Sequence, residues 1–307
     1  LVFAGIMLWI GRADSWSHKI EHPFPYSYLA NDAFQHQTRA QWIKEADDYK
    51  YESPYYSAGF TDVIGFYPPI LAHLSVLLSQ VSGLEVYDTI LFLTVFFALI
   101  GALIFYLMIR QWDKNIAILS MPLTTYLFTI REARVAFFWG HWPALIGDFF
   151  LIASIWVLAN LSKKYSPFFL GAFIAGTILG HTAATVSIIL FIMFFLMCSL
   201  IFKRFNWQEL KKIVLGIIIA TAPNISFLIM FNQTWIKLKL GFSVILDWTG
   251  GGGFIQLNQF NYAPLLIMSA GFILLMLSKK KESFFHKVLA VFTPLMGFTN
   301  YIGFQIR

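Results

Sequence analysis

The sequence predicts an all-α integral membrane protein. Three observations indicate this class: 58% of the residues are hydrophobic, only 12% are charged, and the mean hydropathy is +0.67. A soluble domain carries about a quarter charged residues, so this composition argues against a soluble fold. No segment alternates polar and apolar residues as strands of a membrane barrel do, and a backbone inside lipid must then be helical.

Long apolar runs follow one another along the chain and predict about nine membrane spans by the criterion of ~20 residues. The runs cover residues 1–10, 89–109, 116–130, 142–161, 168–179, 184–202, 213–231, 263–277 and 284–302. The first run is too short to cross about 30 Å of hydrocarbon. We therefore expect it to be the second half of a truncated span. The alternative is a cleaved signal peptide, although the alanine-type cleavage site is poor. We also expect the end at Arg307 to be truncated, and residues 1–307 to form one transmembrane domain.

Basic residues concentrate in alternate connections, which predicts the orientation in the membrane. Twelve fall on one side of the predicted spans: Arg110, Lys114, Lys163, Lys164, Lys203, Arg204, Lys211, Lys212, Lys279, Lys280, Lys281 and Lys287. The short connections of the other side hold four: Arg131, Arg134, Lys237 and Lys239. By the positive-inside rule the twelve face the cytoplasm. The basic pI of about 9.3 then reflects topology, and no nucleic-acid partner is expected.

The segment 11–66 is the most informative part of the chain. It holds eight acidic and five basic residues, a net charge of −3 in a chain whose total is +6. Simply joining two helices requires neither this length nor this charge. We therefore expect recognition or chemistry in this loop. Residues 11–83 are expected to form one extracytoplasmic region that carries interfacial helices.

The first helix expected in this region is Asn31–Ala46, with Asn31 or Asp32 as its cap. Helical spacing puts Asp32, His36 and Arg39 on one face, which presents a carboxylate, an imidazole and a guanidinium together. The alternative is a solvated helix with a capping aspartate and an ordinary polar pair.

A second helix is expected after two prolines, over residues 69–81 and ending at Gly83. It is too short and too polar for an obvious span, so we expect it to lie on the outer leaflet. The alternative is an extension of the following span.

The second outer connection, residues 131–141, supplies further cations. Arg131 and Arg134 are three residues apart and would share a helix face. Guanidinium groups bind phosphate oxygens in pairs, and the neighbouring tryptophans suit a lipid interface. The alternative is an ordinary connection in which Glu132 neutralises Arg131.

Five further positions have specific expectations. Asp148 lies about two turns into a span, where an acid is costly and is either functional or part of helix packing. His181 follows Gly180 at an outer turn and could reach the cavity formed by the outer connections, although a structural role is favoured. Pro223 and Asn224 predict a kink. Cys198 is the one cysteine, which excludes an internal disulfide and a cysteine-based zinc site.

The segments NDAFQHQTRAQWI and FYPPILAHLSVLLSQVSG, followed by a series of spans, resemble the N-terminal half of GT-C glycosyltransferases over about residues 1–200. The pattern Asp32-x-x-x-His36-x-x-Arg39 is similar to the aspartate-bearing helix in the first outer loop of oligosaccharyltransferase catalytic subunits and related mannosyltransferases. This chain departs from them in two ways. It has no D-x-D in the loop, where Asp47-Asp48 is only an adjacent pair, and no C-terminal soluble domain is visible.

The resemblance implies a glycosyltransferase that uses a polyprenyl-phosphate-linked sugar donor at the extracytoplasmic face of a prokaryotic plasma membrane, with an unknown acceptor. Glycosyl transfer needs a carboxylate at the reacting centre and a cation for the leaving phosphate. We expect Asp32 to be the catalytic carboxylate and, with Asp62, a ligand of a divalent metal such as Mg or Mn. The donor-binding residues expected are His36, Arg39, Arg131, Arg134 and His141.

Two other functions remain open from the sequence. One is a multi-span transporter or flippase of lipid-linked or polar solutes, for which only Asp148 offers an ionisable group at membrane depth. The other is a non-catalytic membrane scaffold.

Overall fold

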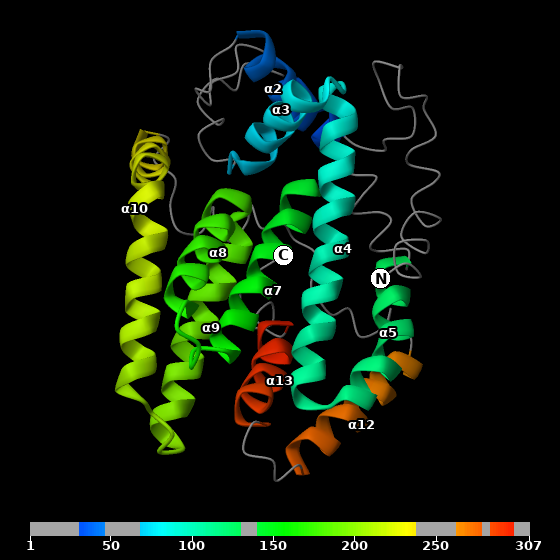
Figure 1. Ribbon diagram of the computed structural model, residues 1–307, viewed down its shortest axis with the longest axis vertical. Coiled ribbons are helices and arrows are strands. Elements are labelled where there is room, and N and C mark those ends of the chain that lie inside the picture. The colour runs from blue at the N-terminus through cyan, green and yellow to red at the C-terminus, as the bar shows by residue number, and fades with distance from the viewer. Residues whose placement is uncertain (1–30, 47–67, 130–139, 238–261, 278–282, 298–307) are drawn as a thin grey trace. The chain divides into compact units, whose positions relative to one another are not determined.

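The computed structural model describes residues 31–46, 68–129, 140–237, 262–277 and 283–297 (Figure 1). Its helices are α2 (Asn31–Ala46), α3 (Ile70–Ser82), α4 (Val86–Trp112), α5 (Lys114–Thr129), α7 (Trp142–Ala159), α8 (Ser166–Gly180), α9 (Thr182–Ile201), α10 (Trp207–Lys237), α12 (Tyr262–Leu277) and α13 (Ser283–Gly297). No strand occurs within these ranges, so the all-α class is confirmed for them.

The chain divides into two compact units, which are described separately. The first contains residues 1–185 and 212–234, and the second contains residues 186–211 and 235–307. The first unit carries all the described residues that the sequence predicted for the site.

Most of the apolar runs expected as spans coincide with described helices, and the run 1–10 lies outside the described residues. Four described helices are long and apolar enough to cross a membrane: α4, α7, α9 and residues 207–232 of α10. Shorter apolar helices are α3, α8 and residues 284–295 of α13. The chain is thus a membrane protein by its helices, while a total of nine spans stays a prediction.

Large apolar side chains cover the outer faces of these long helices. Phe92, Phe96 and Phe105 are exposed along α4, and Ile218 and Ile225 are exposed along α10. A water-soluble surface rarely presents apolar stripes of this extent, whereas a lipid-facing surface consists of them.

Within the first unit, α7 packs between α4 and α8. On one side the Phe149 ring meets Phe97 of α4, with ring centroids 4.9 Å apart. On the other side Gly180 of α8 allows a close approach to Gly147, because a Cβ added to Gly180 would lie 3.1 Å from the Cα of Gly147. Small residues of this kind let membrane helices pack backbone to backbone.

One end of the first unit gathers most of its described basic residues. Gln111 and Asn160 pair the C-terminal ends of α4 and α7 through amide hydrogen bonds of 3.0 and 3.2 Å. The Lys212 ammonium of α10 donates to the carbonyl oxygens of Leu161, Ser162 and Lys163, at 2.6, 3.3 and 3.1 Å. These contacts bring together the connections after α4, after α7 and before α10. All three were expected on the cytoplasmic side because of their basic residues. We call this the basic end of the first unit; it also carries Arg110, Lys114, Lys163 and Lys164.

At the other end of α4, a tight turn separates α3 from α4. Gly83 adopts φ +74°, and its N–H donates to the carbonyl of Ser79 at 2.9 Å, which closes α3. The Thr89 hydroxyl of α4 donates to the carbonyl of Ser75 at 2.9 Å. α3 is therefore the separate helix that the sequence predicted, and the alternative of a plain extension of α4 is wrong. Figure 1 shows α2 and α3 together at this end of α4.

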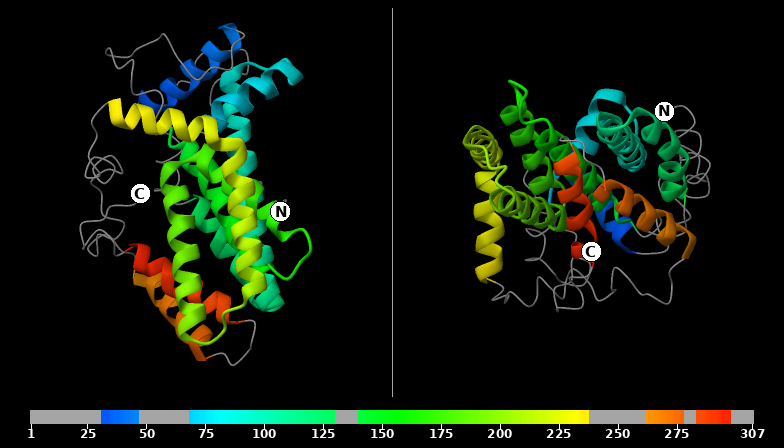
Figure 2. Two further views of the ribbon diagram at one scale, coloured as in Figure 1. Left: turned by 90° about the vertical axis from the view of Figure 1, so that its left-hand side faces the viewer. Right: turned by 90° about the horizontal axis from the view of Figure 1, so that it is seen from below.

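α10 bends in its C-terminal half (Figure 2), and Pro223 lies inside this helix. Proline removes a backbone donor and kinks a helix. The Asn224 amide donates to the carbonyl of Ala220 at 2.7 Å and so helps to satisfy the backbone near the kink. The kink predicted from the Pro223-Asn224 pair is confirmed.

The second unit has an aromatic core between α9 and α13. Phe191 packs edge-on against Phe292 with ring centroids 5.2 Å apart, and Phe195 against Phe285 at 5.4 Å. Cys198 is free and buried on α9.

Candidate functional site

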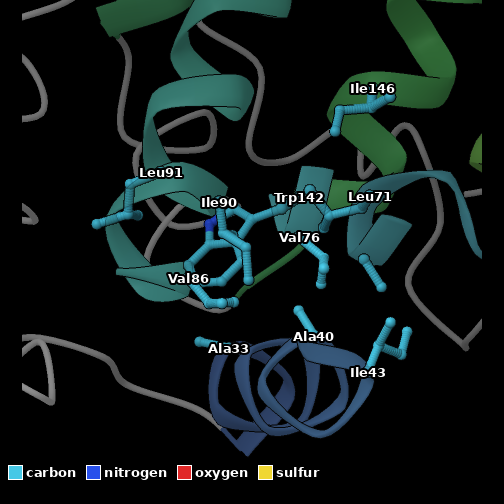
Figure 3. Packing of buried hydrophobic residues seen from close by; sticks show 11 residues of the cluster. Ala33, Ala40, Ile43, Leu71, Val76, Val86, Ile90, Leu91, Trp142 and Ile146 are labelled. Atoms are coloured by element: carbon cyan, nitrogen blue, oxygen red, sulfur yellow. The ribbon is translucent and has the colours of Figure 1, made fainter. Parts of the chain in front are cut away.

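The polar face of α2 is turned into the protein. His36 and Arg39 are only 4% and 5% exposed, and Ala33, Ala40 and Ile43 of the same helix are buried. The alternative of a solvated helix is therefore wrong, because a solvated face would leave these side chains in water. Figure 3 shows Ala33, Ala40 and Ile43 pointing from α2 towards the apolar residues above it.

Trp142, the first residue of α7, lies fully buried in this apolar core. It packs in one cluster with Val76 of α3, Ile90 of α4 and Ile146 of α7 (Figure 3). A tryptophan buries about 150–250 Å², which corresponds to at most about 4–6 kcal/mol at ~25 cal/mol/Å². This core fixes α2 against α7 and holds His36 and Arg39 in position.

Gly140 brings the start of α7 against the first turn of α2. It adopts φ +82°, and a Cβ added to it would lie 2.3 Å from the backbone nitrogen of Ala33. Only glycine allows both this conformation and this approach. A hydrogen bond also joins the His36 ring to the Gly140 backbone. The next residue, His141, therefore lies beside the polar face of α2.

His181 joins this group from the junction between α8 and α9. It packs against Gly147 of α7, where an added Cβ would lie 2.5 Å from the Cβ of His181. His181 interacts electrostatically with both His36 and His141. We call His36, Arg39, His141 and His181 the histidine cluster.

Burial and mutual repulsion keep two of these imidazoles neutral at pH 7. Burial, followed by the charges of Arg39, His141 and His181, lowers the pKa of His36 to about 3, against a small opposing effect of the Gly140 hydrogen bond. Burial and then His141 lower the pKa of His181 to about 4. At neutral pH both rings can donate one hydrogen bond and accept another.

The structure thus brings together three of the residues predicted for the site, His36, Arg39 and His141. Asp32 is half-buried in the first turn of α2, one turn before His36. Asp47, Asp48, Asp62, Arg131 and Arg134 lie outside the described residues.

A structural role was favoured for His181, with a place near the other site residues as the alternative, and the structure supports the alternative. A single histidine after a glycine has no spacing that indicates a site, so only the packing of α8 against α7 could reveal its place. Sequence reasoning also passed over Asp88, which is 3% exposed in the first turn of α4. An acid at the start of an apolar run was its only signal.

Asp148 of α7 is exposed within a candidate span. It follows His141 by seven residues, so helical spacing puts the two on the same side of α7, about 10 Å apart along the axis.

The described residues do not by themselves fit the expected metal site. Among them, no group of three or more His, Cys, Asp and Glu side chains is placed to hold a metal ion. Magnesium and manganese prefer several oxygen ligands. Asp32 offers one carboxylate, and its expected partner Asp62 is outside the described residues.

Comparison of the chain with known protein families, curated proteins and solved structures gives no match. No function can therefore be transferred to it from a relative. The chemistry of Asp32 and of the histidine cluster is the remaining basis for a functional proposal.

Proposed function

We propose that the protein is a glycosyltransferase of the GT-C type. It moves a sugar from a polyprenyl-phosphate-linked donor to an acceptor at the extracytoplasmic face of a prokaryotic plasma membrane. One observation carries the proposal: the buried polar face of α2 meets His141. This contact lies at the N-terminal ends of α4 and α7, and the basic end lies at their C-terminal ends. By the positive-inside rule the end with this contact is the outer end of the bundle, where the headgroup of a lipid-linked sugar lies.

The dimensions of the first unit agree with this placement. α4 has 27 residues and is therefore about 40 Å long. This length exceeds the ~30 Å of the hydrocarbon core, so the two ends of α4 reach opposite interfaces. The α2–α3 end and the basic end then lie on opposite sides of the membrane.

In the proposed reaction, Asp32 is the general base. Its carboxylate accepts the proton of the acceptor nucleophile as the nucleophile attacks the anomeric carbon and the bond to the donor phosphate breaks. Asp32 suits this role because it is half-buried in the first turn of α2, and an acceptor can reach a carboxylate that is not fully buried.

Arginine and histidine residues bind the donor phosphate and stabilise the charge that grows on it as it leaves. Arg39 provides a fixed guanidinium, and His36 and His141 provide N–H donors beside it. Arg131 and Arg134 are proposed to complete this phosphate site from the connection before α7. No step is assigned to a metal, because Asp62, the second expected ligand, lies outside the described residues.

A transporter or flippase is the second candidate. The exposed carboxylate of Asp148 within α7 favours it, since acids at membrane depth often mark solute or proton pathways. Uptake of a labelled solute into sealed vesicles, without formation of a glycosylated product, would support this candidate.

Transfer of a labelled sugar from polyprenyl-phosphate donors to membrane lipids and proteins tests the glycosyltransferase proposal. We expect transfer by the wild-type protein and a loss of at least 100-fold in Asp32→Asn, since general-base catalysis contributes about 10²–10⁴-fold. Glu45→Gln is the matched control, because Glu45 is an exposed carboxylate on the same helix. Unchanged transfer by Asp32→Asn would remove Asp32 from the mechanism, and no transfer by the wild type from any such donor would contradict the proposed reaction.

A further inference from the structure

We propose that the histidine cluster binds a tetrahedral oxyanion, such as a phosphate ester or sulfate, and takes up protons on His36, His141 and His181 as it does so. This goes beyond the proposed function, because it concerns the coupling of anion binding to protonation. It holds both for a lipid headgroup and for a free anion.

The geometry gives the cluster three independent sources of donors. His36 and Arg39 come from α2, His141 precedes α7, and His181 lies between α8 and α9. Two glycines hold these elements together, Gly140 against Ala33 and Gly147 against His181. Groups that converge from separate rigid helices are preorganised, so that little ordering is needed when a ligand binds.

Without a ligand, the charges within the cluster oppose protonation. The charged neighbours that lower the pKa of His36 are Arg39, His141 and His181, and His141 lowers that of His181. Each is cationic when protonated. A bound oxyanion would attract the protonated forms at short range, and this attraction would raise the pKa values of His36 and His181.

Other titratable groups occupy the surrounding elements. They are Asp32 on α2, His73 on α3, Asp88 on α4 and Asp148 on α7. Carboxylates that lie close to an imidazole favour its protonated form, whereas a protonated His73 would oppose it. No carboxylate is among the groups that shift the pKa of His36 or His181, and burial with the neighbouring cations lowers both pKa values in the absence of a ligand.

The coupling predicts that affinity rises as pH falls. Each proton taken up on binding strengthens the affinity by up to tenfold for every pH unit, in the range between the free and the bound pKa. Sulfate is the better probe, because it remains a dianion from pH 5 to 8 while phosphate itself titrates near pH 6–7.

The test is calorimetric titration of the purified protein, in phosphatidylcholine nanodiscs, with sodium sulfate at pH 6 in two buffers of different ionisation enthalpy. The difference in the observed heats gives the number of protons taken up. We expect about one or more protons for each sulfate bound by the wild-type protein. We also expect at least tenfold tighter binding at pH 5.5 than at pH 7.5.

Three variants and a control identify the groups that take up the protons. His181→Gln and His141→Gln replace half-buried side chains, and each should bind sulfate with fewer protons taken up and a flatter pH dependence. His36→Gln should do the same if it folds; where it does not fold, the other two variants decide. The control is His286→Gln on α13 of the second unit, which should behave as the wild type.

A second arm distinguishes the source of the anion. Nanodiscs that contain a polyprenyl phosphate are compared with nanodiscs of phosphatidylcholine alone. Proton uptake only on addition of sulfate supports a site for free anions. Uptake only with the lipid phosphate supports a headgroup site. Absence of uptake in both arms overturns the proposal, and so does uptake that His141→Gln and His181→Gln leave unchanged. Failure of sugar transfer alone would contradict the proposed reaction and leave this site intact.

Discussion

The imidazole of His36 lies beside the indole of Trp142, with ring centroids 6.3 Å apart and an angle of 46° between their planes. One ring belongs to α2 and the other to the first turn of α7. The polar face of α2 therefore packs directly against Trp142, a fully buried residue of the apolar core. A change that moves α2 must disturb both the core and the site.

Acid is expected to destabilise the protein through His36. Its pKa is about 3 in the folded state and about 6.5 when unfolded, so between these values the unfolded chain binds the extra proton. Stability from this group is present above pH 6.5 and is lost as pH falls. The loss from pH 7 to pH 5 is about 2 kcal/mol. Thermal unfolding in detergent at the two pH values measures it, and an equally steep pH dependence in His36→Gln would contradict this assignment.

Gly140→Ala is expected to separate α7 from α2. Alanine at φ +82° costs about 1–2 kcal/mol, and the collision with Ala33 adds about 1–3 kcal/mol. Gly83→Ala is the matched control, since Gly83 also has a positive φ but its added Cβ meets nothing within 4 Å. The fall in Tm should be clearly larger for Gly140→Ala, and equal falls would show that the contact with Ala33 contributes nothing.

Gly147→Ala is expected to push His181 out of place, because the new Cβ would lie 2.5 Å from the Cβ of His181. Overpacking of this kind costs about 1–3 kcal/mol. Gly101→Ala provides the comparison: its Cβ would meet Phe149 at an ordinary 3.9 Å, and alanine in a helix is better than glycine by about 0.5–1 kcal/mol. Unfolding temperatures of the two variants should move in opposite directions. If Gly147→Ala does not lower the unfolding temperature, His181 must lie farther from α7 than the structure shows.

Lys212→Met is expected to loosen the basic end. It removes three hydrogen bonds to the carbonyls of Leu161, Ser162 and Lys163. The cost should be about 1–2 kcal/mol, because two of the three bonds are exposed to solvent. Lys211→Met removes an exposed lysine from the neighbouring position and should change Tm little. Similar Tm values for both variants would mean that the hydrogen bonds of Lys212 do not stabilise the fold, and that its charge serves only to set the orientation in the membrane.

Much of the fold was predictable from the sequence, since the apolar runs and their punctuation determine where helices begin and end. The helix Asn31–Ala46 and the stop of α3 at Gly83 are confirmed. Capping residues and a left-handed glycine are local signals, and they require no knowledge of tertiary contacts.

The environment of α2 could not be predicted in the same way. The spacing of Asp32, His36 and Arg39 identified a shared face, but polar residues of this kind usually face water. Burial of this face depends on Trp142 and on the backbone approach at Gly140, which are about 100 residues away in sequence. Such a contact leaves no periodic signal. For the same reason His181 could not be assigned to the cluster from the sequence.

Labelling of single cysteines tests the central claim, that the site formed by α2 and α7 faces outward and the basic end faces the cytoplasm. Cys198→Ala first removes the one native cysteine. Glu45→Cys and Lys164→Cys then place thiols at exposed positions of α2 and of the connection between α7 and α8. In intact spheroplasts, an impermeant maleimide should label Glu45→Cys at once and Lys164→Cys only after permeabilisation. Labelling of both thiols from the same side would contradict the account.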